Sequence, residues 1–134
     1  MQTIHLETQN NTPESHDALW MLAQMYCRFS IKKKASIISF LLSDAGNEIF
    51  ICISHHITIP SSESGIHRVC KISPYDKKGR RYTNFVDVSI NGNTSKEIVR
   101  SYIFDPIKYV KNIKNDKKTD KIEEVLAGNL KLLL

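Results

Sequence analysis

One segment, residues 13–31, most constrains how this chain can fold. Thr12 supplies an N-cap hydroxyl, Pro13 suits the first helical position, and Glu14 sets a carboxylate near the positive end of the helix dipole. Apolar residues then recur at helical spacing on one face: Ala18, Leu22, Met25 and Phe29. The pattern predicts one long amphipathic helix, and the lysines at positions 32–34 complement its C-terminal end.

Most of the remaining chain carries the short apolar runs and the alternation that are typical of strands. The expected strands are residues 3–8, 36–42, 48–54 and 82–90, with a further element at 96–104 and a hairpin-type connection at 43–47. Residues 55–60 are expected to form a connector or a short strand. In the tail, residues 117–134, Thr119 is the expected N-cap, and Val125, Leu126 and Leu130 are the expected apolar anchors.

These elements predict a single α+β domain, a mostly antiparallel sheet packed with helices. A chain of 134 residues can bury a core without metals or disulfides, and it contains no repeat or low-complexity linker. The longest apolar runs, 37–42 and 49–53, are too short to span a bilayer, so no membrane role is expected.

The cysteines and histidines predict no special chemistry. Cys27, Cys52 and Cys70 are odd in number and lie among apolar residues, which indicates buried, reduced thiols. His5, His16 and the pair at 55–56 show no metal-ligand spacing with them, so no metal and no cofactor is expected. The first residues enter a strand pattern without a leader. This favours a cytoplasmic protein, or an organelle matrix protein whose transit peptide has been removed.

The most informative stretch runs from Ser64 to Phe85, SGIHRVCKISPYDKKGRRYTNF. It contains the tripeptide Ser73-Pro74-Tyr75 and then the run Gly79-Arg80-Arg81-Tyr82-Thr83. This stretch resembles the codon-reading core of bacterial-type class I peptide chain release factors, most of all the branch that reads UGA and UAA. In that branch, Ser-Pro-Phe precedes Gly-Arg-Arg-His-Thr. The resemblance extends over nearly the whole chain and implies the fold of the release-factor codon-recognition superdomain.

The hydrolytic Gly-Gly-Gln loop of that family has no counterpart in this sequence, because no two of the five glycines are adjacent and none precedes a glutamine. Where the family inserts its catalytic domain, a turn at 91–95 leads into Ile98–Ile103. We therefore expect a core at 1–90, a turn at 91–95 that replaces the catalytic domain, and a C-terminal segment at 96–134. Residues 88–90 and 98–103 are expected to pair as antiparallel neighbours. The family's N-terminal domain also has no counterpart, and the chain is not expected to be an enzyme.

The resemblance implies which residues meet codon bases. The loop Ser73-Pro74-Tyr75 would face the second and third bases, and Tyr82 stands where the family has a stacking histidine. A phenol can stack on a base for roughly 1–3 kcal/mol, although it lacks the hydrogen-bonding pattern of imidazole. Thr83 offers a hydroxyl to a base edge. Glu14 would contact the first uridine from the helix tip, or serve only the helix dipole, because the glycines that open this helix in the family are absent.

Basic residues around the same loop are expected to hold RNA phosphates. The net charge of +5 favours an RNA surface, and arginine suits bidentate phosphate contacts. The alternative for this cluster is a solvated loop on a hairpin that touches no codon. His67 is expected to be a hydrogen-bonded structural histidine rather than a catalytic one. The expected phosphate-binding residues are Arg68, Lys77, Lys78, Arg80 and Arg81.

Together these features predict a non-catalytic release-factor-like protein that binds the decoding centre or a stop codon in the ribosomal A site without hydrolysing peptidyl-tRNA. The expected partner is the ribosome, through rRNA and mRNA. The alternative is an RNA-protecting or ribosome-rescue adaptor that reuses the same face for another RNA or a protein. The tyrosine at position 82 and the missing glycines favour this alternative. A third hypothesis is a subunit that recruits a separate hydrolase or rescue factor.

Overall fold

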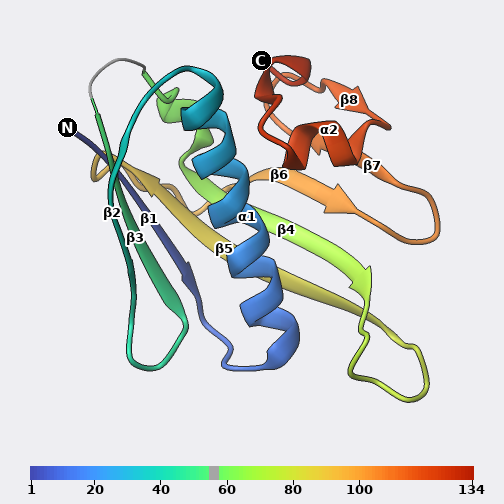
Figure 1. Cartoon of the computed structure of the whole chain (residues 1–134). Coiled ribbons are helices and arrows are strands. Elements are labelled where there is room, and N and C mark those ends of the chain that lie inside the picture. The colour runs from blue at the N-terminus through green and yellow to red at the C-terminus, as the bar shows by residue number, and fades with distance from the viewer. Residues whose placement is uncertain (55–57) are drawn as a thin grey trace.

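Eight strands form one sheet, in the order β2-β3-β1-β5-β4-β6-β7-β8, in a computed structural model that describes residues 1–54 and 58–134 (Figure 1). All neighbouring strands are antiparallel except β4 and β6, which run parallel. The predicted α+β class is therefore confirmed. The strands are β1 (Gln2–Thr8), β2 (Ile37–Leu42), β3 (Glu48–Ile53), β4 (Gly65–Ile72), β5 (Arg81–Ile90), β6 (Ile98–Ile103), β7 (Tyr109–Asn112) and β8 (Lys118–Thr119).

The long helix α1 (Pro13–Lys32) begins where the sequence predicts. The Ser15 amide donates to the Thr12 hydroxyl at 3.2 Å, and the Thr12 amide donates to the Ser15 hydroxyl at 3.0 Å, which closes a reciprocal cap. The helix lies across the sheet and buries its apolar face on β1, β3 and β5 (Figure 1). Leu19, Leu22 and Tyr26 have no exposed surface. The core therefore sits between α1 and the sheet.

The opposite face of the sheet, which we call the open face, follows from the alternation of side chains along each strand. In β5, Val86 and Val88 are buried beneath α1, whereas Thr83 and Phe85 are exposed on the open face. The two α-helices of the described residues, α1 and the shorter α2 (Ile122–Leu126), contact each other on the core side. The open face is thus free to present side chains to a partner.

The expected antiparallel pairing of residues 88–90 with 98–103 is wrong. Both edges of β5 are already occupied, by β1 and by β4, so no edge remains for β6. Instead β6 pairs in parallel with β4, where Val69 lies opposite Tyr102. Residues 91–97 pass the end of β4, and the Ile66 amide donates to the Glu97 carbonyl at 2.8 Å. This connection therefore leads from β5 past one intervening strand, β4, to β6.

The tail differs from the prediction at one position. Thr119 pairs with Val110 as part of β8, so it is not the N-cap of α2. The helix begins after Lys121, whose amide donates to the Thr119 hydroxyl at 3.2 Å and whose side chain makes no capping hydrogen bond. The pairing with β7 draws Thr119 into the sheet. Val125 and Leu130 are buried as expected, and Leu126 is partly buried against the core: these are the three predicted anchors.

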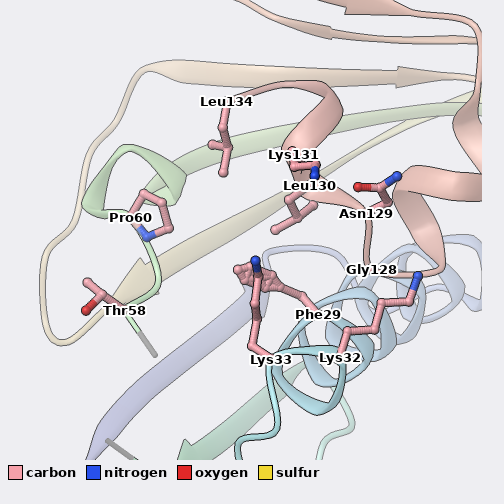
Figure 2. Close-up of a pocket in the computed structure, with 10 residues that line it drawn as sticks. All are labelled: Phe29, Lys32, Lys33, Thr58, Pro60, Gly128, Asn129, Leu130, Lys131 and Leu134. Carbon is pink, nitrogen blue, oxygen red and sulfur yellow. The ribbon is translucent and has the colours of Figure 1, made fainter. Parts of the chain in front are cut away.

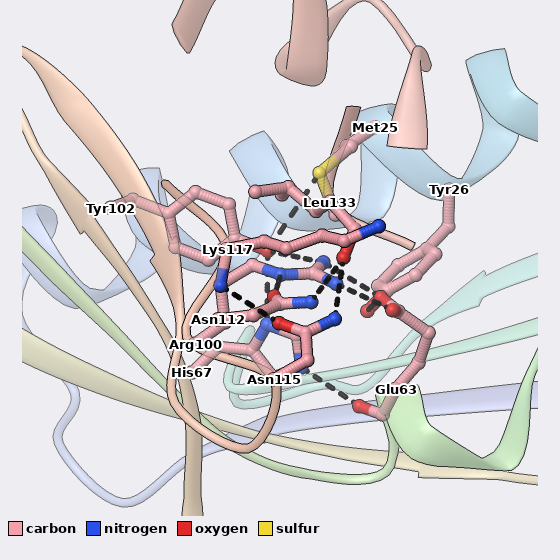
Figure 3. Close-up of polar contacts among 10 residues, drawn as sticks. All are labelled: Met25, Tyr26, Glu63, His67, Arg100, Tyr102, Asn112, Asn115, Lys117 and Leu133. Carbon is pink, nitrogen blue, oxygen red and sulfur yellow. Dashed lines mark hydrogen bonds and ion pairs between the residues drawn. The ribbon is translucent and has the colours of Figure 1, made fainter. Parts of the chain in front are cut away.

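A buried ion pair joins the segment before β4 to β6 (Figure 3). Arg100 donates to both carboxylate oxygens of Glu63, at 2.7 Å and 2.5 Å, and to the Asn112 amide oxygen at 2.5 Å. The Tyr26 hydroxyl from α1 donates to the same carboxylate at 2.9 Å. Both charged side chains are almost fully buried, at 2% exposed for Arg100 and 1% for Glu63. The network ties α1, β6 and β7 together.

His67 belongs to this network, as the sequence predicts for a structural histidine. Its Nε2 lies 2.8 Å from the Glu63 carbonyl and its Nδ1 lies 2.9 Å from the Tyr102 hydroxyl. A carbonyl can only accept, so Nε2 carries the proton and Nδ1 accepts from the tyrosine. Burial, and then the charge of Arg100, lower the pKa of His67 to about 4.

Of the three cysteines, only Cys70 is fully buried, whereas Cys27 and Cys52 are partly exposed. The prediction of buried thiols is therefore correct for one and only partly correct for two. Cys52 lies on the open face, because its neighbours in β3, Ile51 and Ile53, occupy the core face.

The predicted connector at 55–60 falls in part outside the described residues. Among the described residues, no helix is long and apolar enough to cross a membrane.

Gly128, which follows α2, allows a close approach between the C-terminal segment and α1. Its φ is +103°, and a Cβ built there would lie 2.6 Å from the Phe29 amide nitrogen. We expect Gly128→Ala to lower the free energy of unfolding by about 2 kcal/mol, since it adds both a steric clash and backbone strain. Urea denaturation of the variant measures this. The matched control is Gly79→Ala, at φ +64° with no atom within 4 Å, and an equal loss there would refute the clash.

Candidate RNA-binding site

Residues 73–80 form the loop of the β4–β5 hairpin, and hydrogen bonds within it fix its shape. The Ser73 amide donates to the Arg80 carbonyl at 3.2 Å, and the Gly79 amide donates to the Asp76 carbonyl at 3.0 Å. Ser73 is buried, and its hydroxyl accepts from the Tyr75 amide at 3.1 Å. Ser73 therefore supports the loop, while Pro74, Tyr75, Lys77 and Lys78 are exposed on it.

The carboxylate of Asp76 organises this loop. It accepts from the Lys78 amide at 2.8 Å, the Arg80 guanidinium at 2.6 Å and the Tyr82 hydroxyl at 3.0 Å. The hydrogen bond from Arg80 and then that from the Lys78 amide hold the pKa of Asp76 below its usual value. The charge of Arg80 is thus already paired with a carboxylate. Arg81, the next residue, instead donates to the Asp105 carbonyl at 3.1 Å.

The first turns of α1 meet the same loop. The Tyr75 hydroxyl donates to Asp17 at 2.9 Å, across 58 residues of sequence. This hydrogen bond, and then burial and the charges of Asp17 and Glu14, raise the pKa of Tyr75. The hydrogen bond to Asp76, with burial and the same Glu14 charge, raises the pKa of Tyr82. We call this set the loop–helix edge: Glu14, Asp17, Ser73, Pro74, Tyr75, Asp76 and Tyr82.

Three further predicted site residues, Arg68, Arg81 and Thr83, lie on the open face, because neighbouring residues of a strand point to opposite faces. Thr83 contacts Cys70 at 3.3 Å, and the Arg68 guanidinium donates to the Ser101 hydroxyl at 3.1 Å. With Arg81 they line a hollow of about 390 Å³. Neither Arg68 nor Arg81 forms an ion pair with a carboxylate among the described residues. Two arginines held by neutral acceptors leave their charge available to an anion.

The structure therefore divides the predicted residues into two groups. Glu14, Tyr75 and Tyr82 are brought together at the loop–helix edge, whereas Thr83, Arg68 and Arg81 face the other way. Sequence reasoning assigned no role to two acidic residues that position this edge, Asp17 and Asp76. Asp17 lies three residues after Glu14 on the same helix, so helical spacing could have indicated it, whereas Asp76 lies in a loop where spacing gives no such signal.

One group of side chains has the spacing of metal ligands. His5, Glu7 and Glu48 lie on β1 and β3 with their ligand atoms within 4.8 Å of one another. The His5 Nε2 pairs with Glu48 at 3.0 Å, and burial, followed by a hydrogen bond between the two carboxyls, raises the pKa of Glu7. These contacts within the group account for its geometry without an ion. The sequence did not reveal this group, because the pairing of β1 with β3, and not closeness in the sequence, brings Glu48 to the other two residues.

The chain thus combines a single sheet with a Ser-Pro-aromatic hairpin that lies beside the tip of one long helix. Residues 13–88 match the family model of the PCRF domain, which is more than half of the chain. The chain belongs to this family, and the resemblance expected from its motifs is confirmed.

Relatives that are similar in sequence are bacterial release factors. Peptide chain release factor 2 of Listeria innocua is 37% identical over 92 residues, which cover 63% of this chain and 25% of that protein. The Treponema pallidum protein of the same name is 33% identical over 82 residues, 58% of this chain and 22% of its own length. The chain thus spans about a quarter of the length of these relatives. RF2 of Thermus thermophilus shares the fold, with a TM-score of 0.77 at 16% identity, over 97% of this chain and 65% of that one.

Proposed function

We propose that this protein binds the ribosomal decoding centre as a non-catalytic release-factor-like module and occupies the A site without hydrolysing peptidyl-tRNA. The observation that carries this proposal is the loop–helix edge itself. Tyr75, Tyr82 and Glu14 converge there from segments far apart in a chain of the PCRF family. The expected partners are rRNA and the mRNA stop codon, which would place the protein in the cytoplasm or in an organelle matrix.

The two tyrosines are the residues best suited to contact bases. Tyr75 is 56% exposed, and its hydroxyl is anchored to Asp17. Tyr82 is partly exposed and anchored to Asp76. An anchored ring loses little further freedom when a base stacks on it, and each stacked base contributes roughly 1–3 kcal/mol. We assign base contacts to these rings and to Pro74, with Ser73 shaping the loop. Thr83, on the open face, would contact a different base from the one on which the rings stack.

Tyr82→Ala is the variant that tests stacking. We expect it to weaken binding to stop-codon-programmed ribosomes by about 1–3 kcal/mol, measured by filter binding or by relief of inhibition in a release assay. Tyr82→Phe is the matched control, since it keeps the ring and removes only the hydrogen bond to Asp76. If the two variants bind equally well, the ring does not stack on a base.

The arginines expected to bind phosphates differ in whether their charge is already paired within the protein. Arg80 is paired with Asp76, whereas Arg81 has no carboxylate partner among the described residues. If Arg81 clamps a phosphate, Arg81→Ala should reduce the salt dependence of RNA binding by about 0.7–0.9 of a unit of logarithmic slope. Arg80→Ala should reduce it less. Titrations at four salt concentrations measure both slopes, and equal slopes in both variants would refute this division.

The non-catalytic part of the proposal is supported by the sequence and by the β5–β6 connection. No Gly-Gly-Gln occurs in the sequence, and residues 91–97 link β5 to β6 directly across the end of β4. We propose that 91–95 stands where the relatives insert their hydrolase domain. The purified protein should release no peptide from ribosomes that display UGA or UAA. It should slow release by an authentic factor in proportion to its concentration, and release by this protein alone would contradict the proposal.

A second candidate function is an adaptor that uses the same edge for a different RNA or a protein. The observation that favours it is at the N-terminal tip of α1, where hydrogen bonds among neighbouring residues already occupy the polar groups. The Asn10 carbonyl accepts from the Thr8 and Ser15 hydroxyls, and Asn11 contacts His16 at 2.5 Å. Ribosome binding that is equal on every codon would identify this adaptor. Co-purification with a peptidyl-tRNA hydrolase would identify a recruiting subunit.

A further inference from the structure

A basic pocket lies at the C-terminal end of α1, at the opposite end of that helix from the loop–helix edge (Figure 2). It has a volume of about 450 Å³. The last turn of α1 contributes Lys32, the next residue is Lys33, and the C-terminal segment contributes Lys131. Phe29 and Leu134 supply apolar lining. The pocket therefore combines three ammonium groups with an aromatic ring.

The positive charge of this pocket is not compensated by any side-chain carboxylate among the described residues. No aspartate or glutamate lines it, and none of its three lysines forms an ion pair within residues 1–54 and 58–134. By contrast, two lysines near β7 are paired. Lys108, just before the strand, pairs with Glu123, and Lys111, within it, pairs with Asp116, each at 3.0 Å. The helix dipole accounts for lysines at the end of α1. It does not account for Lys131, which a different segment brings to the same place.

The fold holds these lysines on a fixed framework. Gly128 packs against the Phe29 backbone so closely that a Cβ would clash there. The Arg28 guanidinium donates to the Leu126 carbonyl at 3.2 Å, which ties the end of α2 to α1. The Lys33 ammonium lies 5.9 Å from the centre of the Phe29 ring. The pocket is therefore built by the docking of the C-terminal segment on α1.

We propose that this pocket binds RNA phosphates and forms a second contact with the same RNA-rich partner as the loop–helix edge. The proposal rests on the function proposed above and extends it. The 20 residues of α1 separate the two sites by about 30 Å. One nucleotide cannot reach both, whereas folded ribosomal RNA can. The charged groups of the pocket are three lysine ammonium groups, which suit phosphate contacts, so we expect it to contribute affinity without codon preference.

The test is a triple variant, Lys32→Gln, Lys33→Gln and Lys131→Gln, which keeps a polar side chain at each position and removes three charges. We expect the logarithmic salt slope of ribosome binding to fall by about 2–3 units, with the same loss of affinity on stop and sense codons. The matched control removes three charges elsewhere: Lys96→Gln, Lys108→Gln and Lys111→Gln. This control should change the slope by less than half as much.

Two further measurements distinguish a failure of the pocket proposal from a failure of the proposed function. Binding of a 30-nucleotide single-stranded RNA is measured by fluorescence anisotropy, so the pocket is tested even if ribosomes are not bound. Unchanged slopes for the triple variant on both partners would overturn the pocket proposal and leave codon preference intact. Wild-type binding without codon preference, but with a pocket-dependent slope, would overturn the proposed function instead. If inorganic phosphate shifts the Lys33 amide resonance and RNA does not, the pocket is a small-anion site, which also overturns the proposal.

Discussion

Replacing Glu63 with alanine is expected to lower the free energy of unfolding by about 3–5 kcal/mol, because the guanidinium of Arg100 would remain buried without its counter-charge. The variant also removes the acceptor of the Tyr26 hydroxyl, which lies in the same enclosed space. Chemical denaturation followed by tryptophan fluorescence measures the loss, since Trp20 is the only tryptophan in the chain.

A double variant separates the charge from the packing. Glu63→Leu with Arg100→Met removes both charges together and is expected to lose far less stability than Glu63→Ala, because no charge is left unpaired. If Glu63→Ala and the double variant lose the same amount, the ion pair is not what the single variant disturbs. A loss below 1 kcal/mol in the single variant would show that water or another group compensates Arg100.

Acidification is expected to destabilise the protein by about 3 kcal/mol in total through His67 alone. In the unfolded chain this histidine takes up a proton near its ordinary pKa of 6.5, but in the folded protein only near 4. The unfolded state therefore binds more protons between these values, and stability falls as the pH drops from about 6.5 to about 4. Above that window His67 is neutral in both states and contributes no pH dependence.

The control for this prediction is His67→Gln, which removes the titration and keeps one donor and one acceptor. Its unfolding free energy should lose less than the wild type between pH 7 and pH 5. Burial raises the pKa of Glu63, but the charge and hydrogen bonds of Arg100 lower it on balance. An identical pH slope in wild type and variant would show that folding does not lower the pKa of His67.

Local signals predicted the elements that local chemistry controls. Thr12, Pro13 and the following apolar residues predict α1 to within one residue of its observed end, because capping and helical periodicity act over a few residues. The partner of β6 was not predictable in this way. Its position depends on which strand edges remain free after β1 and β4 have paired with β5, and that is a property of the assembled sheet.

The residues of the candidate site were likewise only partly predictable from the sequence. The family motif identified Tyr75 and Tyr82, but the strand alternation that places Thr83 on the open face became clear only with the register of β5. Of the acidic residues that anchor the two rings, Asp17 had a helical spacing signal, whereas Asp76 had neither a spacing signal nor a motif. Glu63 and Arg100 gave no signal at all, because two isolated charged residues 37 positions apart do not reveal that they are buried together.

Equilibrium binding to programmed ribosomes tests decoding-centre recognition most directly. Ribosomes with an empty A site are prepared with UGA, UAA or a sense codon, and the dissociation constant of the labelled protein is measured on each at one salt concentration. Recognition of a stop codon predicts binding at least about tenfold tighter on one stop codon than on the sense codon, a difference of about 1.4 kcal/mol. That preference should disappear in Tyr82→Ala. Equal dissociation constants on all three ribosomes would contradict codon recognition.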